Sequence, residues 1–366
     1  MTNTATRLLT AATSAMRTFH NPLPVIAASA LVTTVRATSA VGMRIDEWRE
    51  PKLRTIDVRD PILLCGSPRS GTTFLHRFLS ESRMAHACTP YDFVFPARSV
   101  QALLAPLKPS LVARFPTEKA STPAHKIGLN LAEADDASLA LRYFDGFFAS
   151  PLLRGFVTSE PNNVFVGNDD TFERDAAFFE RMWRRKRLAD PSMRVAAKLF
   201  SAAPRLEAFL GRFPKAQILY TVRDPVEMIP SGMSLNVSML KKQFNFDALP
   251  EAERARYHAL LYRSFVAQLR AFHEAWTNSA EVKARTFIVP FPRMMTEFET
   301  VMREALGFLG IDFEKFAPVI ARTAESQRAY RSTHAYNLER FNLSETTIRR
   351  DCDFLSTWWN GKGGVG

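Results

Sequence analysis

Residues 62–73, which read ILLCGSPRSGTT, decide the fold of this 366-residue chain. The first four residues form a short apolar run that ends at Gly66, a pattern typical of a buried parallel strand. Over residues 72–82 the apolar side chains recur at helical spacing, which predicts an amphipathic helix. The stretch therefore predicts a strand joined to a helix by a glycine-rich turn, an arrangement whose backbone N–H groups can cradle a phosphate.

Strand and helix patterns alternate downstream of this turn, which predicts an α/β fold with a parallel sheet covered by helices on both faces. In such a sheet, ligand-binding loops lie at the carboxyl ends of the strands. The further predicted strands are residues 193–200, 216–222 and 286–290. The predicted helices are residues 204–213, one that begins at Pro225, 252–275 and 294–309.

The composition is that of a globular protein with a substantial core, since 46% of the residues are hydrophobic. A net charge of +11 favours anionic partners such as nucleotides or membrane surfaces. Nucleic acid is not expected, because the basic residues are dispersed and no recognition motif is present. The three cysteines include no CxxC pair, which argues against a disulfide framework or a zinc site and favours the reducing cytoplasm.

The chain divides into an N-terminal helical extension, residues 1–58, and a main domain, residues 59–366. Within the main domain, residues 85–160 contain seven prolines and are predicted to form a lid-like insertion over an acceptor site. Residues 1–45 contain four arginines and no Asp or Glu. This composition fits an organellar transit peptide or an amphipathic helix that docks on the domain or on a membrane, and we favour the helix. The apolar stretch 23–35 is too short to span a bilayer.

The glycine-rich turn departs from the phosphate loop of nucleoside triphosphatases in one position. Gly66 and Gly71 have the spacing of the GxxxxGK[ST] motif, but Thr72 stands where that motif has lysine. The cation within the turn is Arg69 instead. Without a lysine that reaches the β- and γ-phosphates, the loop suits a nucleotide whose single 5′-phosphate carries a small transferable group.

The segment Pro68-Arg69-Ser70-Gly71-Thr72-Thr73 resembles the 5′-phosphosulfate loop of sulfotransferases. Residues 220–225, which read YTVRDP, and Ser231 resemble the 3′-phosphate segment of the same family. The resemblance runs from about residue 60 to the end and is closest to bacterial sulfotransferases of the class that includes tyrosylprotein sulfotransferases. It implies a P-loop-like fold, 3′-phosphoadenosine 5′-phosphosulfate (PAPS) as donor, adenosine 3′,5′-bisphosphate as product, and no metal.

Two weaker resemblances extend the candidate site. Residues 125–136 resemble a family stretch with an acidic cluster, although one acid is missing, and residues 330–336 resemble a late loop that closes over the 3′-phosphate. Residues 290–293, PFPR, stand where the family has an acidic motif. The resemblance implies the following nucleotide-binding residues: Pro68, Arg69, Ser70, Gly71, Thr72, Thr73, Arg223, Ser231 and Arg331.

Sulfuryl transfer needs a group that holds the donor, a group that stabilises the leaving oxygen and a base. Arg69 and the loop amides suit the first two tasks, and Lys198, at the end of a predicted strand, adds a second cation. The candidate bases are His125, Glu133, Asp135 and Asp136, with Asp136 or Glu133 favoured and Asp92 as the next candidate.

The predicted acceptor is a hydroxyl group of a small molecule, a lipid or a glycan. Two alternatives remain at this stage: a nucleotide-dependent kinase, against which Thr72 argues, and an inactive nucleotide-binding scaffold. The expected location is the cytoplasm, with a peripheral membrane contact through the N-terminal segment, and the oligomeric state is left open.

Overall fold

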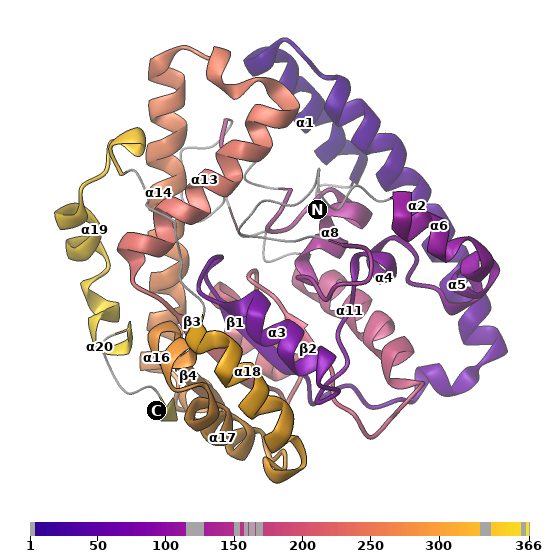
Figure 1. Cartoon of the computed structure of the whole chain (residues 1–366). Coiled ribbons are helices and arrows are strands. Elements are labelled where there is room, and N and C mark those ends of the chain that lie inside the picture. Colours follow the sequence, from indigo (N-terminus) through magenta and orange to yellow (C-terminus); the bar gives the residue numbers. More distant parts are fainter. Residues whose placement is uncertain are drawn as a thin grey trace.

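A computed structural model describes residues 4–114, 128–149, 154–156, 160, 165, 171–329, 338–359 and 364–365. Four parallel strands form the centre of the fold, as the sequence predicts (Figure 1). They are β1 (Ile62–Gly66), β2 (Ala196–Lys198), β3 (Gln217–Val222) and β4 (Thr286–Pro290). The order is β2-β1-β3-β4-β5, in which β5 (Gly364–Val365) is an antiparallel edge strand that the sequence did not predict.

The register brings the functional ends of the strands to one edge of the sheet. Leu64 pairs with Lys198 on one side of β1, and Gly66 pairs with Thr221 on the other. All four strands are buried, except for the half-buried first residue of β3. The loops that follow β1 and β3 therefore leave the sheet next to each other and next to the end of β2.

Helices cover both faces of the sheet, and the side chains of β1 alternate between two separate cores. Ile62 and Leu64 pack with one set of helices, whereas Leu63 and Cys65 pack with the other. The first set is α3 (Thr72–Glu81), α16 (Phe291–Thr296), α17 (Phe298–Leu309) and α18 (Ala317–Ala329). The second set is α11 (Phe172–Arg187), α12 (Leu206–Arg212), α13 (Pro225–Phe244) and α14 (Glu251–Asn278).

The N-terminal segment forms two helices, α1 (Thr4–Phe19) and α2 (Leu23–Arg49), and α2 packs on helices of the insertion. The insertion contributes α4 (Pro90–Val94), α5 (Arg98–Leu104), α6 (Lys108–Arg114) and α8 (Asp136–Tyr143). The remaining α-helices are α15 (Ala280–Ala284), α19 (Glu345–Asp351) and α20 (Ser356–Trp359). Short 3-10 turns are η1 (Pro51–Arg54), η2 (Ala105–Leu107), η4 (Ala203–Arg205), η5 (Phe246–Ala248), η6 (Glu314–Phe316), η7 (Glu339–Phe341) and η8 (Asp353–Leu355).

Close contacts hold α2 against the domain. A Cβ on Gly42 would lie 2.6 Å from the Cβ of Ala97, so glycine permits this approach. The buried carboxylate of Asp46 accepts hydrogen bonds from the backbone N–H groups of Arg98 and Ser99, each at 2.8 Å, and so caps α5. It also pairs with the buried Arg185 of α11 at 2.9 Å. Between residues 23 and 49, α2 contains an 18-residue window with a mean hydropathy of 1.4, long and apolar enough to cross a membrane by length and composition.

Some local predictions differ from the structure. The predicted strand 193–200 has strand geometry over three residues only, and the predicted helix 294–309 is broken at Glu297, whose φ of −126° and ψ of 39° are not helical. The basic run 184–187 at the end of α11 lies partly in the interior of the protein. Arg185 and Arg187 are buried there, and Arg187 pairs with Asp60 at 2.5 Å.

Candidate active site

The turn between β1 and α3 has a backbone that few sequences can adopt. Arg69 has φ +75° and Gly71 has φ +97°, both in the left-handed region. A Cβ on Gly71 would also lie 2.5 Å from the Cε of Met294 and 2.8 Å from a ring carbon of Phe291. Glycine is therefore favoured at position 71 by the positive φ and by the close approach of the Phe291 ring.

Hydrogen bonds within the turn fix its shape and leave polar groups available for an anion. The hydroxyl of Ser70 lies 2.7 Å from the carbonyl oxygen of Ser67 and 2.6 Å from the hydroxyl of Thr221. The hydroxyl of Ser67 is buried without a hydrogen-bond partner. Because Gly71 offers no capping side chain, none occupies the N–H groups of the first turn of α3 from that position. The turn therefore presents donors where an anion would complete the helix cap.

Three cationic side chains come from the carboxyl ends of three adjacent strands. Lys198 ends β2, Arg69 follows β1 and Arg223 follows β3. The Nε of Arg69 donates to the hydroxyl of Ser231 on α13 at 3.0 Å, and Arg223 donates to the carbonyl oxygen of Arg69 at 3.3 Å. The structure thus brings together the two segments that the sequence matched separately.

Arg223 is held by two neighbours. Its guanidinium pairs with Glu227 one helical turn along α13, and it lies 4.5 Å from the centroid of the Phe291 ring. Phe291 was noted in the sequence only as part of a departure from the family pattern. In the structure this aromatic side chain orients Arg223 and packs over Gly71.

Lys198 supplies an ammonium group at the start of α3. Its side chain is almost fully buried, and its Nζ donates to the hydroxyl of Thr73 at 2.8 Å and to the carboxylate of Glu133 at 3.0 Å. Lys198 is therefore a buried side chain with two hydrogen-bond partners, and not a solvated residue at the end of a strand. Position 72 of the turn has no cation, but the ammonium of Lys198 reaches the same end of α3 from the neighbouring strand.

Glu133 and Asp136 occupy different environments. The side chain of Glu133 is 12% exposed and also meets Arg77 at 3.4 Å. Asp136 is fully buried, where it accepts hydrogen bonds from the backbone N–H of Phe200 at 2.5 Å and from the hydroxyl of Ser201. Burial raises the pKa of Asp136 to about 6.

The other two acidic candidates are also engaged. Asp135 is buried and accepts from the indole of Trp183 at 3.1 Å and from the backbone N–H of Lys198 at 3.0 Å. Burial raises the pKa of Asp135 to about 7. Asp92 accepts from Thr89 at the start of α4 and pairs with Lys186 at 2.6 Å. Of these candidate acids, Glu133 is the one that contacts the ammonium of Lys198.

Two further candidates, His125 and Arg331, lie outside the described residues. Sequence reasoning missed Arg77 and His76 on α3. Arg77 follows Thr73 by four residues, so both side chains lie on the helix face toward Glu133, a spacing that could have revealed the cluster. His76 is buried, its Nε2 donates to the carbonyl oxygen of Ala196 at 3.0 Å, and burial lowers its pKa to about 3, so the ring is neutral.

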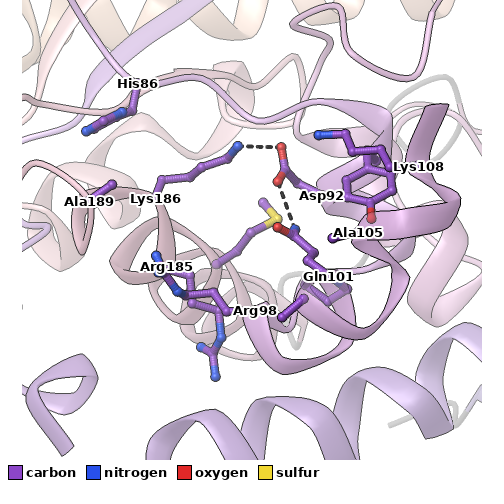
Figure 2. A pocket seen from close by; sticks show the side chains of 13 residues that line it. His86, Asp92, Arg98, Gln101, Ala105, Lys108, Arg185, Lys186 and Ala189 are labelled. Atoms are coloured by element: carbon purple, nitrogen blue, oxygen red, sulfur yellow. Dashed lines mark hydrogen bonds and ion pairs between the residues drawn. The ribbon is translucent and has the colours of Figure 1, made fainter. Parts of the chain in front are cut away.

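A cavity of about 520 Å³ lies apart from the turn, between α4, α5 and α11 (Figure 2). No residue of the turn lines it, nor do Lys198, Arg223 or Ser231. Among the described residues, no group of three or more His, Cys, Asp or Glu side chains is arranged to hold a metal ion.

Comparison with known proteins fits this geometry. A family model described as the sulfotransferase family matches residues 61–315. The sulfotransferase STF1 of Mycobacterium tuberculosis H37Rv superposes with a TM-score of 0.71 and 17% identity, covering 95% of this chain and 90% of that one. The sulfotransferase STF9 of Mycobacterium avium superposes with a TM-score of 0.70 and 16% identity, and the match covers 92% of this chain and 86% of that one. No curated protein sequence matched the chain.

The structure defines the class as an α/β protein with a parallel sheet and a glycine-rich turn suited to an anion. Since the family model covers well over half of the chain, the protein belongs to the sulfotransferase family and is a sulfotransferase. This family assignment disfavours the kinase and the inactive scaffold.

Proposed function

We propose that the protein transfers a sulfuryl group from PAPS to a hydroxyl acceptor and releases adenosine 3′,5′-bisphosphate. The observation that carries this proposal is the hydrogen bond between Arg69 and Ser231, with Arg223 bonded to the backbone of Arg69. It joins a loop suited to a 5′-phosphate with a segment suited to a 3′-phosphate. A nucleotide with both phosphates fits this pair of sites better than a triphosphate does.

In this proposal, Arg69 and the amides at the start of α3 hold the 5′-phosphosulfate, while Arg223 and Ser231 hold the 3′-phosphate. The uncapped first turn of α3 and the buried, unpartnered hydroxyl of Ser67 support the 5′ assignment. The forked guanidinium of Arg223, oriented by Phe291, suits phosphate oxygens at the 3′ end.

In this proposal, Lys198 and Glu133 are the residues that assist the transfer step. The acceptor oxygen forms a bond to sulfur while the bond between sulfur and the 5′-phosphate oxygen breaks. Lys198 stabilises the negative charge on the departing oxygen, and Glu133 takes the proton of the acceptor hydroxyl. Their contact at 3.0 Å places cation and base side by side. Asp136, with its oxygens bonded to residues 200–201, serves to hold that backbone instead.

Charge compensation in the proposed reaction comes from Arg69 and Lys198, so a metal ion is not required. We expect the acceptor to be a small molecule, a lipid or a glycan. The three cysteines are free and buried, which agrees with a cytoplasmic location.

Calorimetric titration with adenosine 3′,5′-bisphosphate and with adenosine 5′-monophosphate tests the nucleotide site. The wild type should bind the bisphosphate more tightly. Arg223→Ala should weaken the bisphosphate by about 10- to 150-fold, the equivalent of 1.5–3 kcal/mol for a charged hydrogen bond, with a much smaller effect on the monophosphate. Ser231→Ala should show the same selectivity with a smaller loss.

Arg303→Ala is a matched control, because Arg303 pairs with Glu314 on the surface, away from the turn. It should leave both affinities unchanged. Equal losses for the two ligands in Arg223→Ala and Ser231→Ala would refute the 3′ assignment. A wild type that fails to bind the bisphosphate, or that transfers phosphate from ATP, would refute PAPS as the donor.

A further inference from the structure

The exposed apolar side chains of this protein are concentrated on one group of helices. All ten strongly exposed large hydrophobic residues in the described part of the chain lie on α1, α2, α5 and η2. Trp48 is 79% exposed and Leu103 is 78% exposed. We call this set the apolar face: Leu9, Met16, Leu23, Ile26, Leu31, Val41, Ile45, Trp48, Leu103 and Leu107.

Several of these residues share one side of α2, and the other helices that carry them are neighbours of α2. On a helix of 3.6 residues per turn, Leu23, Val41 and Trp48 of α2 point within about 20° of one another, and the buried Val32 lies on the opposite side. α1 and α5 both contact α2, and the three helices lie at one margin of the molecule, away from the sheet (Figure 1). Exposed apolar side chains that are gathered on neighbouring helices in this way are typical of an interaction site.

Basic residues outnumber acidic ones around the apolar face, where Glu47 and Glu50 are the acidic neighbours of Trp48. Residues 4–45 contain four arginines and no acidic residue. Several exposed basic side chains on and beside these helices form no ion pair within the described part of the chain. They are Arg17, Arg44, Arg49, Lys52, Arg54, Arg98 and Arg114. Apolar side chains surrounded by unpaired cations match the surface of a bilayer that contains anionic lipids.

The cavity beside α5 adds a second site of positive charge. Its lining includes Arg98, Lys108, Arg185 and Lys186 (Figure 2). Arg185 is paired with Asp46 and Glu47, and Lys186 with Asp92, so Arg98 and Lys108 supply the positive charge of the cavity. Arg98 and Lys108 form no ion pair within the described residues, and η2, which carries the exposed Leu107, contacts both α5 and α6. The cavity is therefore lined by residues of α5 and η2, the elements that carry Leu103 and Leu107.

We propose that the apolar face docks on the surface of an anionic phospholipid bilayer, with an acidic headgroup in the cavity between α4, α5 and α11. The helix α2 lies along the bilayer rather than across it. One side of α2 is committed to the domain through Asp46, which caps α5 and pairs with Arg185. Crossing the membrane would expose this buried charge pair to the acyl chains.

Vesicle flotation of the full chain tests the proposal. The wild type should float with vesicles of phosphatidylcholine and phosphatidylglycerol, and far less with phosphatidylcholine alone. Leu23→Glu with Trp48→Glu should lower binding about 100-fold, since each inserted side chain contributes about tenfold. Arg98→Glu with Lys108→Glu should lower binding to the anionic vesicles by at least about tenfold.

Arg263→Glu with Arg322→Glu is the matched control, since it reverses two exposed charges on α14 and α18, which carry none of the apolar face. It should float like the wild type, and circular dichroism should show all variants folded. Three outcomes would overturn the proposal. In the first, the wild type does not bind vesicles that contain phosphatidylglycerol. In the second, the wild type is a dimer, and Leu23→Glu with Trp48→Glu makes it monomeric. In the third, the chain stays in the membrane after alkaline carbonate extraction.

Discussion

Replacing Glu133 by glutamine removes a charge and a base while keeping the shape of the side chain. The amide oxygen of the new side chain can still accept from Lys198, so the local hydrogen bond survives. If Glu133 takes the acceptor proton, turnover should fall by about 10²-fold or more, as general-base contributions are typically 10²–10⁴. The exchange of a charged for a neutral hydrogen bond should cost about 1–3 kcal/mol of folding free energy.

Asp136→Asn is the matched comparison, because it removes one charge three residues away. Its amide oxygen can accept from the backbone N–H of Phe200, and its nitrogen can donate to the hydroxyl of Ser201. Both native contacts are thereby replaced. We expect the turnover per folded molecule to stay within about tenfold of the wild-type value. The loss of a general base would lower turnover by about 10²-fold or more.

Turnover is measured with radiolabelled PAPS and the best acceptor from a panel of alcohols, phenols and glycolipids, and bisphosphate affinity is measured in parallel. A base matters less as the acceptor becomes more acidic, so the loss in Glu133→Gln should shrink from an aliphatic alcohol to a nitrophenol. Purely structural damage would not follow acceptor acidity. The assignment fails if Asp136→Asn loses more turnover than Glu133→Gln, or if the loss is the same for every acceptor.

Lys198→Met should lower turnover by about 10- to 150-fold, the equivalent of a 1.5–3 kcal/mol charged hydrogen bond, in the same assay. Gly71→Ala should weaken bisphosphate binding and lower the melting temperature, because the added Cβ meets Met294 at 2.5 Å and the residue has φ +97°; scanning calorimetry with and without nucleotide checks both. The raised pKa values of Asp135 and Asp136 mean that the folded state binds more protons than the unfolded state between about pH 4 and 7. Their contribution to stability is therefore greatest below about pH 4 and is lost as the pH rises toward 7. Urea unfolding from pH 5 to 8 should show a weaker pH dependence in Asp135→Asn than in the wild type.

The sequence was sufficient for the central architecture, because local patterns determine it. The turn 66–71 lies between a continuous apolar run and a helical repeat, and that alternation recurs for β3 and β4. The predicted strand 286–290 has the bounds of β4. Predictions were poorer where tertiary contacts set the geometry. Neither residue at the break, Thr296 or Glu297, is a proline or a glycine, and β5 pairs only because the chain end returns to the sheet.

The candidate site was predictable in its nucleotide segments but not in its charge network. Arg69, Arg223 and Ser231 lie in motifs, so their proximity could be expected from adjacent strands. The partners of the acidic side chains could not be predicted from the sequence, because side chains one to three residues apart point into different surroundings. Glu133 meets Lys198, whereas Asp136 turns into the core to hold residues 200–201.

Lys198 approaches the start of α3 at the point where Thr72 replaces the lysine of the triphosphatase motif. In the triphosphatase motif the lysine belongs to the loop and reaches along the phosphate chain. Here the ammonium belongs to Lys198 at the end of β2, the strand that neighbours β1 in the sheet order β2-β1-β3. It therefore meets Thr73 and Glu133 together, at 2.8 and 3.0 Å. The triphosphatase motif places no carboxylate beside its lysine, whereas Lys198 contacts the carboxylate of Glu133. A lysine on the neighbouring strand contacts Glu133, so the proposed reaction would have its cation for the leaving group next to its base for the acceptor.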